Sequence, residues 1–328
     1  MEESNNLREK VLQVLESKRG EFISGEILAE SLNVSRAAIW KIIDSLRSEG
    51  YKIKAVSNKG YSLEKINDVL TREGIKSYLR EDSRVSDIIC LDKIDSTNNY
   101  AKKIALNNAK HGTLIAANSQ TAGRGRFGHS FDSPAGTGLY MSLILRPKIE
   151  SKKFQFITIA AAVAVCQSIK DLCGFNPVIK WVNDIYLDGK KICGILTEAV
   201  TGFESGEIES VITGIGINIT TQKFSGDYNA GALFQDDNII CSRNSICARI
   251  ADYIMNFAEN LSSQEIINSY RERSILTGKN ISYIKDGGKL NAHVSGIDDE
   301  GGLIIINESG NQEILRSGEV FTVRENLS

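Results

Sequence analysis

The sequence predicts an α+β protein made of three units in order along the chain. Apolar residues recur at helical spacing near the N-terminus, strands alternate with helices in the centre, and short strands separated by Gly-Gly, Asp-Asp and Ser-Gly turns close the chain. The 328 residues exceed the usual size of one domain, and 41% of them are hydrophobic, which suffices for a buried core. We therefore expect an N-terminal winged helix-turn-helix, a central α/β domain with a mixed sheet, and a small C-terminal β-barrel.

Three short helices are expected in the first unit, residues 1–66. Apolar residues recur at helical spacing over residues 7–15, and Ser24 can cap a second helix over residues 25–31. Ser35 can cap a third helix that ends near Gly50, where a left-handed residue is wanted. A short turn joins the second helix to the third, so the outline is helix, tight turn, helix.

A two-stranded wing is expected directly after these helices. Residues 51–55 alternate apolar with basic side chains, residues 57–60 form a turn, and residues 61–63 return as the second strand. Between positions 36 and 60 stand six basic and two acidic residues, which gives 6 − 2 = +4 in a chain whose net charge is −2. This local charge favours DNA binding over the alternative of a packing or dimerisation module. The expected DNA contacts are Ser35, Arg36, Lys41, Lys52, Lys54 and Lys59.

The central domain, residues 85–276, is expected to follow a polar linker over residues 67–84. Its hairpin-like strand runs favour a mixed sheet over a regular βαβ series. We expect strands at residues 85–91, 113–117, 138–145, 178–181, 185–187, 192–200 and 210–219. Helices are expected at residues 97–108, 154–171, 246–260 and 264–274, and residues 277–328 should form the barrel.

Composition predicts a cytoplasmic protein with no membrane contact. The N-terminus is polar and lacks the apolar region of a secretory signal, and the longest apolar stretch, residues 157–166, is too short to span a bilayer. The six cysteines form no CxxC pair, so we expect reduced thiols and no structural metal.

A loop in which glycine alternates with arginine is the most informative segment for chemistry. Residues 120–128 read Gln-Thr-Ala-Gly-Arg-Gly-Arg-Phe-Gly between two expected strands. Such a backbone can approach a ligand closely, and each guanidinium offers planar donors to a carboxylate or phosphate. The loop therefore favours an anionic substrate, although a basic surface loop or a nucleic-acid contact is the alternative reading.

Further blocks flank this loop in a distinctive order. They are Asp95–Asn98, Ser133-Pro134 with Gly138–Ser142, Lys180–Asp184, Lys190–Glu198 and Gly214–Asn218. In order and spacing these blocks resemble the biotin protein ligases, from about residue 85 to the C-terminus. The N-terminal unit is similar to that of the longer bacterial members that also repress the biotin operon.

The resemblance implies a reaction in two steps. The biotin carboxylate attacks the α-phosphate of ATP to give biotinyl-5'-AMP, and a lysine of a biotin carboxyl carrier protein then attacks the mixed anhydride. ATP and biotin would be the substrates, with Mg²⁺ as the metal. The implied partners are the carrier protein of acetyl-CoA carboxylase or a related carboxylase, operator DNA of biotin genes, and a second copy of the chain when the adenylate is bound.

The resemblance also implies roles for individual residues. Those expected to act in catalysis are Lys191, Arg124 and Arg126. Those expected to bind biotin are Ser96, Thr97, Gln120, Gly123, Arg124, Lys191, Gly194 and Gly214. Those expected to bind ATP or the adenylate are Arg126, Phe131, Lys180, Asn183, Asn218, Glu319 and Arg324, and Asp184 is expected to help hold the metal. Phe131 stands where the repressor-type enzymes carry a tryptophan that closes over the adenine.

Three alternatives stay open at this point. A lipoate ligase shares the superfamily and the chemistry, but the Gly-Arg loop and residues 180–184 favour biotin. A ligand sensor with a degenerate catalytic domain is disfavoured because Arg124, Arg126 and Lys191 are all present. A ligase whose N-terminal unit is not a repressor is the alternative that the sequence excludes least well.

Overall fold

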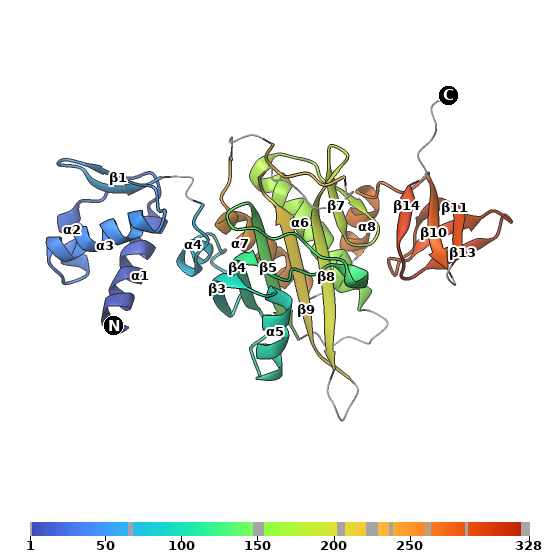
Figure 1. Cartoon of the computed structure of the whole chain (residues 1–328), viewed down its shortest axis with the longest axis horizontal. Helices are drawn as coiled ribbons and strands as arrows, with labels where there is room; N and C mark the ends of the chain where they lie inside the picture. Colours follow the sequence, from blue (N-terminus) through green and yellow to red (C-terminus); the bar gives the residue numbers. More distant parts are fainter. Residues whose placement is uncertain are drawn as a thin grey trace.

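The structure is a computed structural model that describes residues 2–64, 68–146, 154–201, 207–220, 229–235, 239–259, 261, 264–285 and 288–322. Three bodies follow one another along the longest axis of the molecule (Figure 1). The N-terminal helical unit lies at one end, the large mixed sheet in the middle, and the C-terminal sheet at the other end.

The N-terminal unit has the expected helices and wing. Its elements are α1 (Glu2–Ser17), α2 (Gly25–Ser31), α3 (Arg36–Ser48), β1 (Ile53–Val56) and β2 (Gly60–Leu63). Ser24 and Ser35 cap α2 and α3, because their side chains accept hydrogen bonds from the backbone N–H groups of Glu26 and Ala38. Gly50 has a φ of 96°, as expected for the residue after α3. These caps and the wing confirm the helix-turn-helix expectation.

The central sheet is mixed, as expected, and has seven strands in the order β3-β4-β5-β9-β8-β7-β6. Its first pair is parallel, and every other neighbouring pair is antiparallel. The strands are β3 (Asp87–Ile94), β4 (Thr113–Gln120), β5 (Gly138–Leu145), β6 (Val178–Lys180), β7 (Asp184–Leu187), β8 (Lys190–Thr201) and β9 (Ile208–Asn218).

Helices cover both faces of this sheet. They are α4 (Arg72–Lys76), α5 (Thr97–Leu106), α6 (Gln155–Cys173), α7 (Arg243–Phe257) and α8 (Gln264–Glu272). Because side chains alternate along a strand, Leu143 of β5 joins the core under α6 and α7, whereas Ile144 joins a smaller cluster under α5. The expected linker over residues 67–84 contains α4, and its Ile75 is fully buried in the larger core.

Helix α6 corrects one expectation from the sequence. We expected the longest apolar stretch to be too short for a bilayer, but α6 has 19 residues and is long and apolar enough to cross one by length and composition. Inside the protein, 72% of its apolar window is buried. The helix is therefore the core helix of the central domain.

The C-terminal unit is an antiparallel sheet of five strands in the order β13-β12-β11-β10-β14. The strands are β10 (Asn280–Lys285), β11 (Gly288–Ile297), β12 (Leu303–Asn307), β13 (Gln312–Leu315) and β14 (Val320–Thr322). Among the described residues β13 and β14 are open edges, so the expected closed barrel is not confirmed. Instead, Ile281, Val294 and Ile305 join the core of the central domain.

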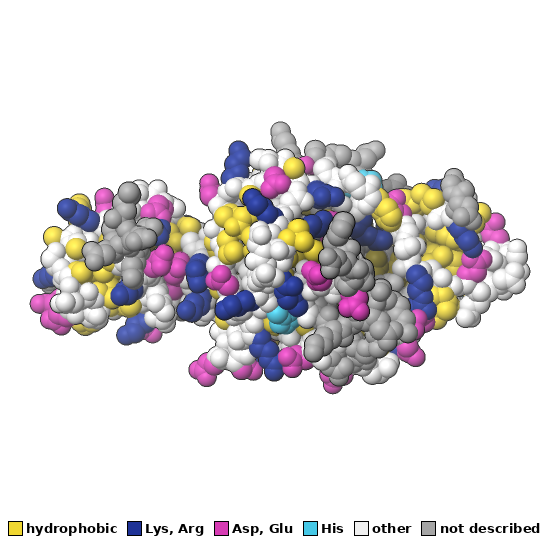
Figure 2. Space-filling view, turned by 90° about the horizontal axis from the view of Figure 1, so that it is seen from below, with side chains coloured by type: hydrophobic (Ala, Val, Ile, Leu, Met, Phe, Trp, Pro, Cys, Tyr) yellow, Lys and Arg dark blue, Asp and Glu magenta, His cyan; other side chains and the backbone are white. Residues whose placement is uncertain are grey.

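Basic and acidic side chains are interspersed on the face of the molecule seen from below (Figure 2). This mixture agrees with the small net charge of the whole chain. Any strong attraction for an anion must therefore come from a local group of cations.

Candidate active site

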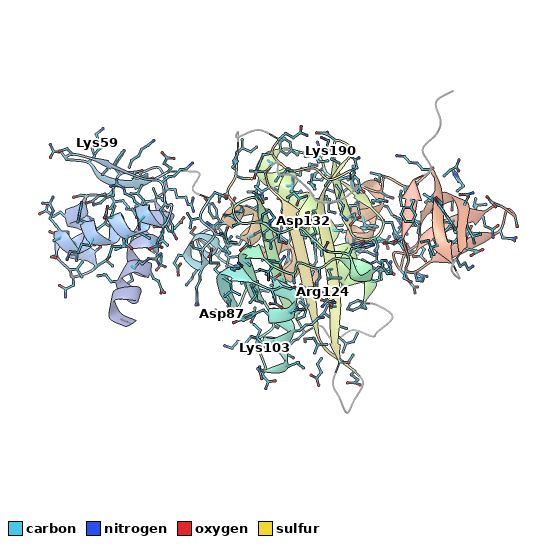
Figure 3. The ribbon with its side chains drawn as sticks, viewed as in Figure 1. Lys59, Asp87, Lys103, Arg124, Asp132 and Lys190 are labelled. Carbon is cyan, nitrogen blue, oxygen red and sulfur yellow. The ribbon has the colours of Figure 1, made fainter. Side chains whose placement is uncertain are left out.

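A cavity of about 500 Å³ opens on the central domain, beside the C-terminal sheet. Figure 3 shows Arg124 and Asp132, which both line this cavity, in front of the strands of the central sheet. The structure brings together most residues that the sequence assigned to substrates. They are Ser96, Thr97, Gln120, Arg124, Arg126, Phe131, Lys180, Asn183, Asp184, Lys191, Gly194, Gly214, Asn218 and Glu319.

Among the described residues, one assigned residue stands apart from that lining. Gly123 lies within the Gly-Arg loop, and a Cβ there would come within 2.3 Å of the Phe131 carbonyl oxygen. Gly123 therefore allows the two sides of the loop to approach each other. Arg324 lies outside the described residues.

One end of the cavity is a network of uncharged polar groups where β4 ends and α5 begins. The Gln120 Oε1 accepts hydrogen bonds from the backbone N–H of Thr97 at 2.8 Å and from its hydroxyl at 3.2 Å. The Gln120 Nε2 donates to the Ser133 hydroxyl at 2.9 Å. Ser96 is buried and caps α5, accepting from the Asn99 N–H at 3.5 Å. Gln120 is therefore held in one orientation.

Asn98 extends this network under the cavity. Its Oδ1 accepts from the Ser142 hydroxyl at 2.6 Å, and its Nδ2 donates to the Glu198 carboxylate at 2.8 Å. Glu198 is in turn paired with the Lys102 ammonium at 2.5 Å. Because these buried polar groups are fixed before any ligand arrives, this neutral end suits an uncharged ligand group that both donates and accepts hydrogen bonds.

Glycines form the floor of the cavity. Gly194 of β8 and Gly216 of β9 face each other in the ladder, and the Phe131 ring lies on them. A Cβ at Gly216 would meet that ring at 2.6 Å, and one at Gly214 would meet the Asn98 Oδ1 at 2.1 Å. The Phe131 ring also packs edge-on against Tyr140, with centroids 6.4 Å apart. The ring thus forms part of the floor, and its role as a nucleotide lid stays a prediction.

The Gly-Arg loop is a small hydrogen-bonded hairpin over the floor. The Gly125 N–H donates to the His129 carbonyl at 2.7 Å, and the Phe131 N–H donates to the Gly123 carbonyl at 2.9 Å. At its tip is a single 3-10 turn, η1 (Arg126–Gly128). The Arg124 guanidinium donates to the Asn99 side chain at 3.2 Å. This hairpin directs both loop arginines toward groups that line or border the cavity.

The other end of the cavity is rich in cations. Lys191 Nζ lies 2.6 Å from Asp184 Oδ1, and the Arg126 guanidinium donates to Asn183 Oδ1 at 3.1 Å. Lys180 and Asp184 are opposite each other across β6 and β7, so the hairpin holds a second ammonium close by. We call Arg126, Lys180 and Lys191 the cationic end.

Burial makes the cationic end receptive to an anion. It lowers the pKa of the Arg126 guanidinium and of the Lys180 ammonium, and the carboxylates of Asp184 and Glu319 only partly oppose this effect. The repulsion from Lys191 lowers the pKa of Lys180 further. An incoming carboxylate or phosphate would restore the electrostatic balance that burial has removed.

The C-terminal sheet completes the cavity. His129 Nε2 of the loop lies 3.1 Å from Glu319 Oε1, next to β14. Phe321 of β14 also lines the cavity, with Lys180 Nζ 6.0 Å from its ring centroid. The sequence assigned no role to His129, Phe321 or Asn98. Asn98 had a signal, because it stands in the Asp95–Asn98 block, whereas the other two depend on how the two domains pack.

The residues expected to contact DNA lie in the N-terminal unit, away from the cavity. Arg36 and Lys41 are exposed on α3, and Lys59 is exposed at the tip of the wing (Figure 3). Lys54 of β1 pairs with Glu64 at 3.2 Å, and Lys52, directly before β1, is exposed. Ser35 caps α3. The Nε and Nη2 of Arg47 donate to the Ile53 carbonyl at 2.9 and 2.8 Å, which fixes the wing to α3.

The chain matches three protein families in order along its length. Residues 7–62 match an HTH domain, residues 90–218 match the biotin/lipoate A/B protein ligase family, and residues 277–323 match the biotin protein ligase C-terminal domain. These matches cover the N-terminal unit, the cavity-bearing sheet and the C-terminal sheet in turn.

Similar proteins agree with these matches. A bifunctional ligase/repressor BirA of Salmonella typhimurium is 32% identical over 312 residues, which cover 92% of this chain and 95% of that protein. One of Bacillus spizizenii is 44% identical over 218 residues, and that match spans 66% of each protein. The solved biotin protein ligase of Aquifex aeolicus in complex with biotin and ATP is 26% identical, with a TM-score of 0.59 over 73% of this chain and all of that one.

Proposed function

Because the chain belongs to the biotin protein ligases, in the group of bifunctional ligase/repressors, we propose that it activates biotin with ATP and transfers it to a carrier protein. The observation that carries this proposal is that one cavity has a neutral hydrogen-bonding network at one end and three cations at the other. A ligand with an uncharged polar ring and a carboxylate, joined to a nucleotide, needs both ends at once.

In the first step, the biotin carboxylate attacks the α-phosphate of ATP, the bond from that phosphorus to the bridging oxygen breaks, and pyrophosphate leaves. The ring of biotin would lie at the neutral end against Ser96, Thr97 and Gln120. Its carboxylate would then lie near Arg124 and Lys191. Two anions must approach each other, and the phosphate gains negative charge as they do, so fixed cations lower the barrier by positioning and charge stabilisation.

In the second step, a lysine ε-amine of the carrier attacks the carbonyl of the mixed anhydride, AMP leaves, and the new amide loses a proton. This step needs no nucleophile from the enzyme. Cys193 lines the cavity, but complete burial raises the pKa of its thiol well above the ordinary value. The thiol therefore stays protonated and unreactive.

We assign the nucleotide side to Arg126, Lys180, Asn183, Asn218 and Glu319, with Phe131 next to them on the floor.

For Mg²⁺, Asp184 offers a carboxylate at the cationic end, with Lys191 against one of its oxygens. No group of three or more His, Cys, Asp or Glu side chains gathers anywhere in the described part of the chain. That fits Mg²⁺, which is commonly held by one or two carboxylates together with substrate phosphates and neutralises their charge.

We propose that the N-terminal unit binds operator DNA of biotin genes through α3 and the wing when the adenylate is bound. A chain of contacts supports this coupling. The buried Arg243 pairs with Asp68, just after the wing unit, at 2.9 Å. Its Nη1 donates to Asn118 Oδ1 at 2.9 Å, and the same oxygen accepts from the Gly136 N–H at 3.2 Å, where the loop rejoins the sheet.

We propose domain bounds of residues 1–66, 85–276 and 277–328, with residues 67–84 between the first two.

A homodimer in the adenylate-bound state would double the contacts with phosphate and bases and would select an inverted repeat in the DNA. The carrier protein would compete for the monomer and consume the adenylate, so DNA binding would report biotin demand. We place the protein in the cytoplasm, where carboxylases and DNA are both available.

One experiment tests the ligase proposal directly. The protein is incubated with ATP, Mg²⁺, a biotin carboxyl carrier domain and either biotin or lipoate, and the carrier is weighed by mass spectrometry. We expect the mass of one biotinyl group on one lysine and no lipoyl product. Lipoyl transfer without biotinyl transfer would replace the proposal with the lipoate alternative.

A second experiment tests the repressor. DNA carrying the promoter of the protein's own biotin genes is titrated with protein in the presence and absence of biotinyl-5'-AMP. We expect tighter and steeper binding with the adenylate. Identical curves would remove the coupling and leave the ligase proposal untouched.

A further inference from the structure

Two of the six cysteines meet where α6 ends and α7 begins, outside the residues that line the cavity. Cys173 is the last residue of α6, and Cys241 stands just before Ser242, which caps α7. Their Sγ atoms are 2.9 Å apart, although 68 residues separate them in the chain. A disulfide bond has an S–S distance of about 2.0 Å, so a shift of less than about 1 Å would bring these atoms to bonding distance.

The two thiols differ in pKa and in exposure, as a reactive pair requires. A hydrogen bond from Cys241 lowers the pKa of the Cys173 thiol, whereas the same contact raises the pKa of Cys241. Cys173 is half-buried, so a small oxidant can reach it, and Cys241 is buried beside it. A thiolate that is accessible and next to a second thiol is the arrangement of redox-sensitive cysteines.

The other four cysteines lack this combination. Burial raises the pKa of Cys90 and of Cys166 to about 12, and it raises those of Cys193 and Cys247 well above their ordinary value. Because the sulfur atoms of Cys173 and Cys241 are in contact and the thiolate is the reactive form, oxidation should select this pair over the other four cysteines.

We propose that Cys173 and Cys241 form an oxidant-sensitive pair that converts reversibly to a disulfide. With hydrogen peroxide as the oxidant, the Cys173 thiolate attacks one peroxide oxygen, the O–O bond breaks, and hydroxide leaves to give a sulfenic acid. The Cys241 sulfur then attacks that sulfenic sulfur, the S–O bond breaks, and water leaves as the Cys241 proton is lost. A dithiol reductant reverses the reaction by thiol–disulfide exchange.

The corner that this bond would lock is also the point where the wing unit joins the ligase domain. The Arg243 N–H donates to Asp68 Oδ1 at 3.1 Å, and Asn244 exchanges hydrogen bonds with the backbone of Val69 and Thr71. A disulfide at Cys241 would fix the chain two residues before Arg243. The pair therefore lies next to the contacts that orient the first unit.

The test uses the full-length reduced protein and hydrogen peroxide at a few equivalents. We expect the intact mass to fall by two hydrogen atoms, the count of free thiols to fall from six to four, and a tryptic peptide that joins Cys173 to Cys241. Dithiothreitol should restore the starting mass. Cys173→Ser and Cys241→Ser should each abolish the cross-linked peptide, whereas Cys90→Ser, the matched control at a half-buried cysteine, should keep it.

Three results would overturn the proposal. They are an unchanged mass at peroxide levels that oxidise a free thiol, a cross-link between another pair, and addition of two or three oxygen atoms to Cys173 with no cross-link. The intact mass and the tryptic peptides of the wild-type protein together distinguish these outcomes, so a serine variant that fails to fold does not leave the question open.

Discussion

The two ends of the cavity satisfy their polar groups in opposite ways. At the neutral end, Thr97, Gln120 and Asn98 are already hydrogen-bonded to one another or to neighbours. At the cationic end, Arg126 and Lys180 are half-buried among too few carboxylates, and the pKa of each is lowered as a result. The first end resembles a preformed binding site, and the second is incomplete until an anion enters.

This difference predicts different kinetic roles. The neutral end would hold the biotin ring, away from the reacting carboxylate, so its contacts contribute about equally to the ground state and the transition state. Their loss should raise KM more than it lowers kcat. Cations that face developing charge contribute more in the transition state, so their loss should lower kcat.

The largest effect is expected at the cationic end. Lys191→Ala removes the ammonium that pairs with Asp184 and leaves this carboxylate facing the incoming phosphate. We expect adenylate formation to slow by roughly 100- to 1,000-fold, chiefly in kcat. The measurement is pyrophosphate release with biotin and ATP at saturation. The matched control is Lys190→Ala, a change at the exposed neighbour outside the cavity lining, which should stay near the wild-type rate.

A smaller effect is expected when the neutral end is disturbed through its floor. In Gly214→Ala the new methyl group would need the space of the Asn98 amide, which lies 2.1 Å from the Cβ position. Displacing that amide should weaken biotin binding by roughly 10- to 100-fold. Isothermal titration with biotin alone measures it. Gly296→Ala, in β11 with no atom within 4 Å of the Cβ position, is the control. Equal biotin affinity in both variants would show that Asn98 is not part of the site.

The sequence predicted well those features that depend on residues close together in the chain. The helices, the wing, the positions of the strands along the chain and the caps at Ser24 and Ser35 all depend on short-range patterns, and the structure confirms them. Most assigned cavity residues also meet, because each block lies at a strand end or a helix start that the sheet places side by side.

What the sequence could not provide depends on packing between distant segments. The Phe131 ring lies on Gly216, a contact that requires β9 and the loop to be placed first. His129 and Glu319 are 190 residues apart, and their contact depends on how the C-terminal sheet docks. The closed barrel was expected from short strands separated by turns, but the described strands form an open sheet, and Val294 belongs to the core cluster of the central domain.

A still smaller effect is expected when the Gln120 side chain is removed from the neutral end. Gln120→Ala removes the acceptor of Thr97 and the donor to Ser133 without adding bulk. We expect KM for biotin to rise by roughly 5-fold while kcat stays within about 3-fold, since a neutral hydrogen bond contributes about 1 kcal/mol. Steady-state kinetics with varied biotin tests this. A fall in kcat at unchanged KM would contradict the equal-binding role of this end.

The smallest effect is a difference in pH dependence between the two ends. Burial lowers the pKa of Lys180 below its ordinary 10.5, so on a rise in pH the folded protein loses this charge earlier than an unfolded chain would. Below that lowered pKa the ammonium is present and attracts the nucleotide, and as the pH rises through it the attraction fades. From about pH 8 to about pH 10, KM for ATP should therefore rise by roughly 2- to 5-fold. This factor corresponds to the free energy that one partly exposed charge contact contributes to binding. The hydrogen bonds to the biotin ring should add nothing to this pH dependence, because Ser96, Thr97 and Gln120 do not titrate. Lys180→Arg keeps the charge over this range and should flatten the ATP profile. An ATP profile in Lys180→Arg that rises as steeply as that of the wild type would show that Lys180 does not carry the effect.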